Sequence, residues 1–80
     1  MKKRVRKSTM PKEIIHLGIR IQDIIKEKGL KQRDVAYDAG LDVENLRKYI
    51  KGTQEMKVST MLKIVRALDI NIEELFKEKS

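Results

Sequence analysis

Hydrophobic residues recur every three or four positions along most of the chain, which is the spacing of helices that bury one face. In the first of these segments they stand at positions 14, 17, 21, 24 and 25. Pro11 precedes the segment, and proline is well tolerated at the first position of a helix. Gly29 follows Lys26 and Lys28, which is the pattern of a helix C-terminus that ends in a left-handed residue. These signals predict a long first helix between Pro11 and Gly29.

The next two apolar stripes are shorter, and turn residues separate them. The first covers residues 31–39 and is followed by Gly40, which is expected to end a second helix. Asp42 is a good N-cap for a third helix, because its side chain can accept a hydrogen bond from a backbone N–H in the first turn. Gly52 follows the last apolar position of that stripe, so the third helix is predicted to span about residues 42–51.

Two further helices are predicted in the last third of the chain. Apolar residues at helical spacing between Val58 and Leu68 predict a fourth helix, which ends near Asp69 because aspartate tolerates the left-handed conformation. Asn71 and Glu74 have the spacing of a capping box and predict the start of a fifth helix. The side chains expected to anchor that last helix are Leu75 and Phe76.

Five short helices, with no strand candidate and no internal repeat, predict an all-α domain. A chain of 80 residues is long enough for one small domain and too short for a barrel or a doubly wound sheet. Short helices are marginally stable alone in water, so each of the five must depend on packing against the others.

The formal charge of +7 is unevenly distributed along the chain. Residues 1–12 contain six basic residues and no acid, whereas residues 13–80 contain thirteen basic and twelve acidic residues. We therefore expect a basic N-terminal arm, residues 1–12, ahead of a folded domain, residues 13–80. An arm of this composition is suited to nucleic-acid phosphates, and the alternative is a terminus that only improves solubility. The charged side chains expected to act in the arm are Lys2, Lys3, Arg4, Arg6 and Lys7.

Composition argues against several classes of function. The chain has no cysteine and one histidine, His16, so it lacks the residues for a disulfide, a thiolate zinc site or a multi-histidine metal site. It has no apolar run of about 18 residues and no signal-peptide pattern, which predicts a cytoplasmic protein without a membrane span. No serine has a plausible catalytic partner, and the glycines are too far apart to form a phosphate-binding loop. We expect no enzyme activity, no cofactor and no metal.

The segment from Gln32 to Gly52 has the features of a helix-turn-helix. Two helices that cross at about 90–120° through a short turn need a small residue at their closest approach, which Ala36 provides. The turn needs a positive φ, which Gly40 adopts at least cost. The helix that starts at Asp42 keeps its outward face free, and such a helix fits a major groove about 12 Å wide.

On these residues, the chain resembles the Cro/repressor (XRE) family of helix-turn-helix domains, which have the lambda-repressor-like fold. The resemblance runs from Leu17 to Phe76 and rests on the order and spacing of five helices and their turn glycines. The matching stretches are LGIRIQDIIKEKGLKQRDVAYDAGL, NLRKYIKG and MLKIVRALDINIEELF. The fold class implied is a five-helix DNA-binding domain with its helix-turn-helix at the second and third helices.

The resemblance also implies a set of DNA-contacting residues. Gln32 and the loop residues Thr53 and Gln54 match positions that contact the DNA backbone, and Lys57 is expected to join them. Leu75 and Phe76 match the last helix, which often helps to pair two domains on a palindromic site. The base-reading positions of the third helix correspond to Asp42, Val43, Glu44, Arg47, Lys48 and Lys51.

Several of these positions differ from the family pattern. Asp42 and Glu44 place two carboxylates at the start of the third helix, where one can act as a cap and the other can accept from a cytosine amino group or repel phosphate. Val43 offers only apolar contact, with a thymine methyl as the natural partner, while Arg47 and Lys48 can donate to guanine or to phosphate.

A second difference concerns the core. Ile25 and Ile50 stand where many family members have a buried arginine–glutamate pair, and we expect these two residues to be in contact.

The sequence therefore predicts a sequence-specific regulator of transcription, such as a repressor, that binds double-stranded DNA with residues 42–51 in the major groove. It is expected to act as a homodimer on a pseudo-palindrome with half-sites about 34 Å apart. The alternative is a protein-interaction module, such as an antitoxin that pairs with a toxin, or a coactivator-type helix-turn-helix domain.

Overall fold

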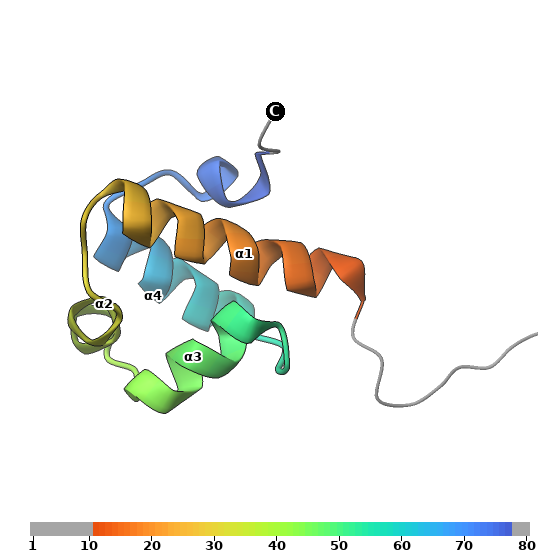
Figure 1. Cartoon of the computed structure of the whole chain (residues 1–80), viewed down its shortest axis with the longest axis horizontal. Coiled ribbons are helices and arrows are strands. Elements are labelled where there is room, and N and C mark those ends of the chain that lie inside the picture. Colours follow the sequence, from red (N-terminus) through yellow and green to blue (C-terminus); the bar gives the residue numbers. More distant parts are fainter. Residues whose placement is uncertain (1–10, 78–80) are drawn as a thin grey trace, which may run out of the picture.

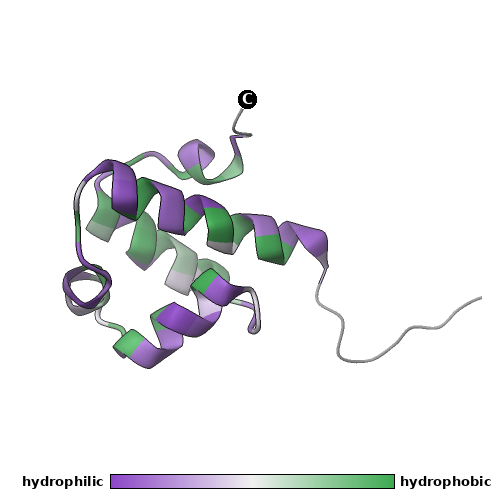
Figure 2. Cartoon of the chain, in the orientation of Figure 1, coloured by the Kyte–Doolittle hydropathy of each residue, from purple (hydrophilic) through white to green (hydrophobic). Residues whose placement is uncertain are grey.

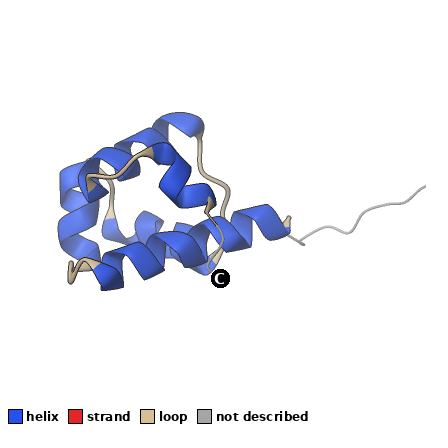
Figure 3. Cartoon of the chain, turned by 90° about the horizontal axis from the view of Figure 1, so that it is seen from above, coloured by secondary structure: helices blue, strands red, loops and turns tan. Residues whose placement is uncertain are grey.

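A computed structural model describes residues 11–77, which form a bundle of helices without a β-strand in that range (Figures 1 and 3). The four α-helices are α1 (Lys12–Glu27), α2 (Gln32–Ala39), α3 (Val43–Lys51) and α4 (Val58–Leu68). A five-residue 3₁₀-helix, η1 (Ile72–Phe76), follows α4. The predicted all-α fold is confirmed, and the four α-helices lie where the apolar periodicity placed them.

The long helix α1 crosses the molecule, with α3 on one side of it and η1 on the other (Figure 1). Helix α1 packs against α3 and η1, whereas α2 packs against α3 and α4. The outward face of α3 and the surface of η1 are therefore separate surfaces of the domain.

The core lies where the apolar stripes of the four α-helices meet. Ile21, Leu46, Ile64 and Leu68, from three different helices, are each at most 1% exposed. Colouring by hydropathy shows α4 as mostly hydrophobic and α2 as mostly hydrophilic (Figure 2). The short α2 thus contributes to the core through a narrow stripe, in which Val35 is 2% exposed.

A glycine in the middle of α1 allows close contact with α3. Gly18 is buried, and a Cβ at this position would overlap the backbone carbonyl oxygens of Tyr49 and Ile50 at the end of α3. Only a residue without a side chain fits there, so the two helices meet backbone to backbone. Sequence analysis did not single out Gly18, although an isolated glycine inside an apolar helical stripe often marks such a close approach.

The expected contact of Ile25 with Ile50 has support from the core. Ile25 on α1 is 3% exposed, and Ile50 on α3 is 8% exposed. Both belong to one hydrophobic cluster, and their helices pack against each other. Their burial in one cluster agrees with the register of the family resemblance, and the direct contact between the two side chains stays a prediction.

The predicted fifth helix forms as a 3₁₀-helix, and its predicted capping box is absent. Asn71 stands at the N-cap of η1, but its side chain makes no capping hydrogen bond. The Glu74 carboxylate instead lies 3.5 Å from Arg20 of α1 and 3.8 Å from Lys77. Arg20, which is 54 positions away in sequence, thus pairs with the carboxylate that the capping-box pattern assigned to the start of the helix.

The two residues expected to anchor this last helix face different environments. Leu75 is 2% exposed and belongs to the core, as expected, while Phe76 is 61% exposed and anchors nothing within the described residues. Phe76 is therefore available at the surface, and Leu75 is not.

Candidate nucleic-acid interface

The turn between α2 and α3 sets the relative orientation of the two helices. Gly40 adopts φ 72° and ψ 32°, the left-handed conformation predicted for it. The N–H of Leu41 then donates to the carbonyl of Ala36 at 2.8 Å, which closes the end of α2. Ala36 is 1% exposed, as expected for the small residue between the helices. The segment from Gln32 to Lys51 is thus a helix-turn-helix.

The start of α3 is capped as the sequence predicted. One oxygen of the Asp42 side chain, Oδ1, accepts from the backbone N–H of Glu44 at 3.0 Å. This contact satisfies one of the free N–H groups at the helix start, where negative charge is also favoured. Of the two carboxylates in the first turn, that of Asp42 is therefore the cap, and that of Glu44 is left for another role.

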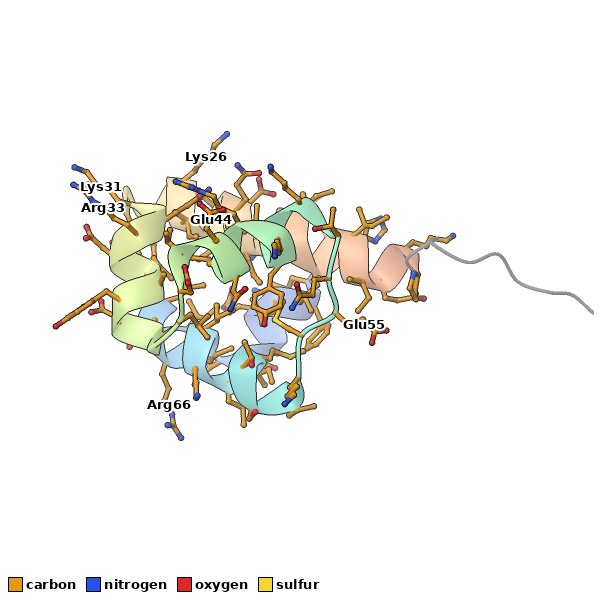
Figure 4. The ribbon with its side chains drawn as sticks, turned by 90° about the horizontal axis from the view of Figure 1, so that it is seen from below. Lys26, Lys31, Arg33, Glu44, Glu55 and Arg66 are labelled. Atoms are coloured by element: carbon orange, nitrogen blue, oxygen red, sulfur yellow. The ribbon has the colours of Figure 1, made fainter. Side chains whose placement is uncertain are left out.

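Helix α3 has one buried face and one exposed face. Leu46, Tyr49 and Ile50 are buried, at 0%, 8% and 8% exposure. The exposed face is polar and includes four of the predicted base-reading residues: Glu44, Arg47, Lys48 and Lys51. In Figure 4, which looks onto α3, this face is open to solvent. Of the two remaining predicted base-reading residues, Asp42 caps the helix, and Val43 is only partly exposed because it packs against the core.

Two charged residues on the exposed face of α3 form an ion pair. Nη1 of Arg47 donates to Oε2 of Glu44 at 2.7 Å, a contact between residues three positions apart. The Arg47 side chain is 49% exposed and the Glu44 side chain 66% exposed. The pair lies on the surface of the helix, and sequence analysis assigned roles to both residues without pairing them. Their spacing is a signal that could have found the pair.

The loop after α3 carries the next group of predicted contacts. Thr53 donates through its hydroxyl to the backbone carbonyl of Lys48 at 3.2 Å, so it closes the end of α3. Gln54 is half-buried, and Lys57 is exposed at the N-cap position of α4 without a side-chain cap. These residues follow α3 directly in the chain and connect it to α4.

Other predicted contact residues lie at the start of α2 or outside the described range. Gln32 is the first residue of α2 and is half-buried. The arm residues Lys2, Lys3, Arg4, Arg6 and Lys7 lie outside the residues that the structure describes.

A second surface lies between α1 and η1, and it includes Phe76, which was expected to help pair two domains. A groove of about 480 Å³ runs there, with Ile19, Arg20 and Phe76 in its lining. Ile19 is 49% exposed and Phe76 is 61% exposed, so the groove has apolar walls. Arg20 stands at the edge of the apolar stripe of α1, and no local signal predicted that it would reach η1.

No metal-binding cluster of histidine and acidic side chains occurs in residues 11–77. Within the same residues, every helix is too short or too polar to cross a membrane.

Comparison with known proteins agrees with this arrangement. A sequence model of the Cro/C1-type HTH DNA-binding domain matches residues 16–78. No curated protein sequence matched the chain.

Several solved structures have a similar fold. The restriction-modification controller protein C.AhdI from Aeromonas hydrophila is 30% identical, with a TM-score of 0.79 over 82% of this chain and 100% of its own. The clp gene regulator ClgR from Corynebacterium glutamicum is 18% identical, with the same TM-score over 82% of this chain and 86% of its own. A variant of the controller protein C.Esp1396I, solved bound to its highest affinity operator site, is 22% identical, with a TM-score of 0.70 over 81% of this chain and 96% of its own.

Proposed function

Because the chain belongs to the family of Cro/C1-type helix-turn-helix DNA-binding domains, we propose that it regulates transcription by binding a specific double-stranded DNA sequence. The observation that carries the proposal is the exposed polar face of α3, held beside α2 by the Gly40 turn. An α-helix with its side chains is about 10–12 Å across, which fits a major groove about 12 Å wide. In this proposal α3 enters the groove and Glu44, Arg47, Lys48 and Lys51 face the bases.

The residues that border α3 would hold it in register on the DNA backbone. Gln32 stands at the start of α2, and Thr53, Gln54 and Lys57 lie between α3 and α4. Polar and basic side chains at such positions contact phosphates and orient the domain without reading sequence. Asp42 has a different part, because one of its oxygens caps α3.

The basic arm would add attraction that does not depend on sequence. Residues 13–80 have nearly equal numbers of basic and acidic side chains, so most of the excess positive charge lies in residues 1–12. Neutralised phosphates release counterions, and the slope of log K against log salt changes by about 0.9 for each phosphate contacted. Deletion of Met1 to Lys7 is therefore expected to weaken binding to all sequences and to flatten the salt dependence, with the preferred motif unchanged.

We also infer that the protein acts as a homodimer through the surface around η1. Phe76 is 61% exposed and Ile72 is 40% exposed, and both are large apolar residues. This surface lies on the other side of α1 from α3, so pairing would leave both copies of α3 open to DNA (Figure 1). Sedimentation equilibrium of the protein and of Phe76→Ser tests this part, since the variant is expected to shift towards monomer.

The experiment that tests DNA recognition is a selection from randomised duplexes at two salt concentrations. Enrichment of one motif by the wild-type protein is the expected result. Arg47→Ala is expected to relax that motif at one position and to cost about 1–3 kcal/mol of binding free energy there. A matched control is Arg66→Ala on α4, which removes an exposed arginine away from α3 (Figure 4). Enrichment of no motif would contradict the proposal and favour the alternative of a protein-interaction module.

A further inference from the structure

The ion pair between Glu44 and Arg47 is a compact group of donors and acceptors on the exposed face of α3. Oε2 of Glu44 and Nη1 of Arg47 are 2.7 Å apart, and both side chains are about half exposed or more. Neither side chain makes another hydrogen bond or ion pair within the described residues. Nη1 keeps a second N–H and Oε2 keeps a second lone pair, and Oε1, Nε and Nη2 are unused, so the pair can still bind a ligand.

Stability does not account for this pair. Exposed ion pairs contribute little to folding, because solvent screens them and two long side chains lose freedom. The start of α3 is already capped by Asp42, so Glu44 is not needed for that purpose. A carboxylate facing DNA would be repelled by phosphates, and its contact with Arg47 removes most of that penalty.

The pair is complementary to one base pair. In the major groove, guanine presents the acceptors N7 and O6, and cytosine presents the N4 amino group as a donor. Guanine O6 and cytosine N4 are hydrogen-bonded to each other, so they lie about 2.9 Å apart. Oε2 of Glu44 and Nη1 of Arg47, an acceptor and a donor, lie at nearly the same spacing, 2.7 Å, and each can make a second hydrogen bond. Each group of the protein then meets the opposite kind of group on the DNA.

We propose that Glu44 and Arg47 read a single G·C base pair as a unit. The guanidinium of Arg47 donates to guanine N7 and O6, and the carboxylate of Glu44 accepts from the N4 amino group of the paired cytosine. This inference rests on the proposed function, since it assigns the base pair that α3 recognises. It makes Glu44 a specificity residue, although a carboxylate on a DNA-binding helix is easily regarded only as a source of repulsion.

The same geometry rejects an A·T pair. Adenine presents the N6 amino group where guanine has O6, and thymine presents O4 where cytosine has the amino group. Arg47 would then face a donor, and Glu44 would face an acceptor. For A·T these two contacts fail together, whereas a T·A pair keeps an acceptor opposite Arg47 and a donor opposite Glu44 and differs from G·C by a methyl group in place of guanine N7.

The first test compares randomised-duplex selections for the wild type, Glu44→Ala, Arg47→Ala and the double variant. The wild type is expected to enrich a motif with one G·C position, and each single variant is expected to lose preference at that position alone. The double variant should lose little more than either single one, because the residues act together. Glu55→Ala is the matched control, since it removes an exposed carboxylate at a distance from Glu44 and should leave the motif unchanged (Figure 4).

The second test alters single atoms of the DNA. Replacing the guanine by 7-deazaguanine removes N7, and replacing the cytosine by 2-pyrimidinone removes the amino group. Each change is expected to weaken wild-type binding about tenfold. Arg47→Ala should be insensitive to the loss of N7, and Glu44→Ala should be insensitive to the loss of the amino group. Circular dichroism of each variant checks that α3 still folds.

The outcomes separate this inference from the proposed function. If the wild type enriches no motif, the proposed function fails. If a motif is enriched and Glu44→Ala retains the same G·C preference, the unit reading is wrong while DNA recognition stands. Uniformly tighter binding of Glu44→Ala to all sequences would also overturn it, because Glu44 would then act only through repulsion of phosphates.

Discussion

Arg20 on α1 donates from Nε to the backbone carbonyl of Glu74 in η1 at 2.7 Å, across 54 positions of sequence. The same guanidinium lies 3.5 Å from the Glu74 carboxylate, so one residue contacts both the main chain and the side chain of its partner. The Arg20 side chain is only 15% exposed, which shields the contact from water. This contact attaches the last described helix to the rest of the domain.

Replacement of Arg20 is therefore expected to loosen η1. Arg20→Ala should lower the free energy of unfolding by about 1–3 kcal/mol, because it leaves the Glu74 carbonyl without its charged donor. Urea unfolding measures the loss. Lys77→Ala is the control, since Lys77 lies 3.8 Å from Glu74 with 62% of its side chain exposed and should change stability by less than about 0.5 kcal/mol. Equal effects of the two variants would show that Arg20 contributes no more than a surface charge.

Gly18→Ala is expected to destabilise the domain, although alanine is the better helix former. In a free helix the change would gain about 1 kcal/mol from propensity. Here the new Cβ overlaps the carbonyl oxygens of Tyr49 and Ile50, which are backbone atoms that cannot rotate away. Overpacking of this kind costs about 1–3 kcal/mol or more. A lower midpoint of thermal unfolding is the expected result, and a higher midpoint would mean that α1 and α3 do not meet at Gly18.

Gly40→Ala tests a different requirement, that of backbone conformation alone. A Cβ at Gly40 would meet no atom within 4 Å, so packing does not oppose it. The left-handed conformation at φ 72° still costs an alanine about 1–2 kcal/mol. Gly40→Asn should cost less, because asparagine adopts this conformation more readily. Chemical denaturation of both variants checks the order, which would be reversed if the side chain rather than the backbone mattered.

Because Ile25 and Ile50 are buried in the same cluster, we expect the stability effect of a substitution at one position to depend on the residue at the other. Ile50→Glu alone should destabilise the fold by about 3–5 kcal/mol, because it buries a charge without a partner, and Ile25→Arg should act similarly. The double variant Ile25→Arg/Ile50→Glu should recover part of that loss as the two charges pair. A double-mutant cycle in urea measures the coupling, expected at about 0.5–3 kcal/mol. Additive losses would show that the two side chains do not interact.

Local signals predicted most of this fold. The turn glycine Gly40 and the N-cap Asp42 could be identified because the groups they satisfy lie within a few residues in sequence. The 3₁₀ form of η1 could not, because Glu74 is taken by Arg20, whose proximity depends on the packed fold. Gly18 was missed for the same reason, since its neighbours Tyr49 and Ile50 come from another helix.

In the candidate site, too, features that depend on nearby residues could be predicted, and features that depend on packing could not. The exposed face of α3 follows from helical periodicity, and the spacing of Glu44 and Arg47 allows their pairing. The partial burial of Val43 against the core depends on how α3 packs, so the apolar contact with DNA expected for it competes with a structural role.

Because α1 and α3 meet backbone to backbone at Gly18, the stability of the domain and the chemistry of the exposed face of α3 depend on different residues. Helix α3 is held by this contact and by its buried residues Leu46, Tyr49 and Ile50, while its exposed side chains lie on another face. Under the proposed function, substitutions at Glu44, Arg47, Lys48 or Lys51 should therefore alter the DNA sequence that is bound, with little effect on the free energy of folding. If the proposed function holds, a lineage built on this domain can acquire a new sequence preference in single steps, without a compensating change in the core.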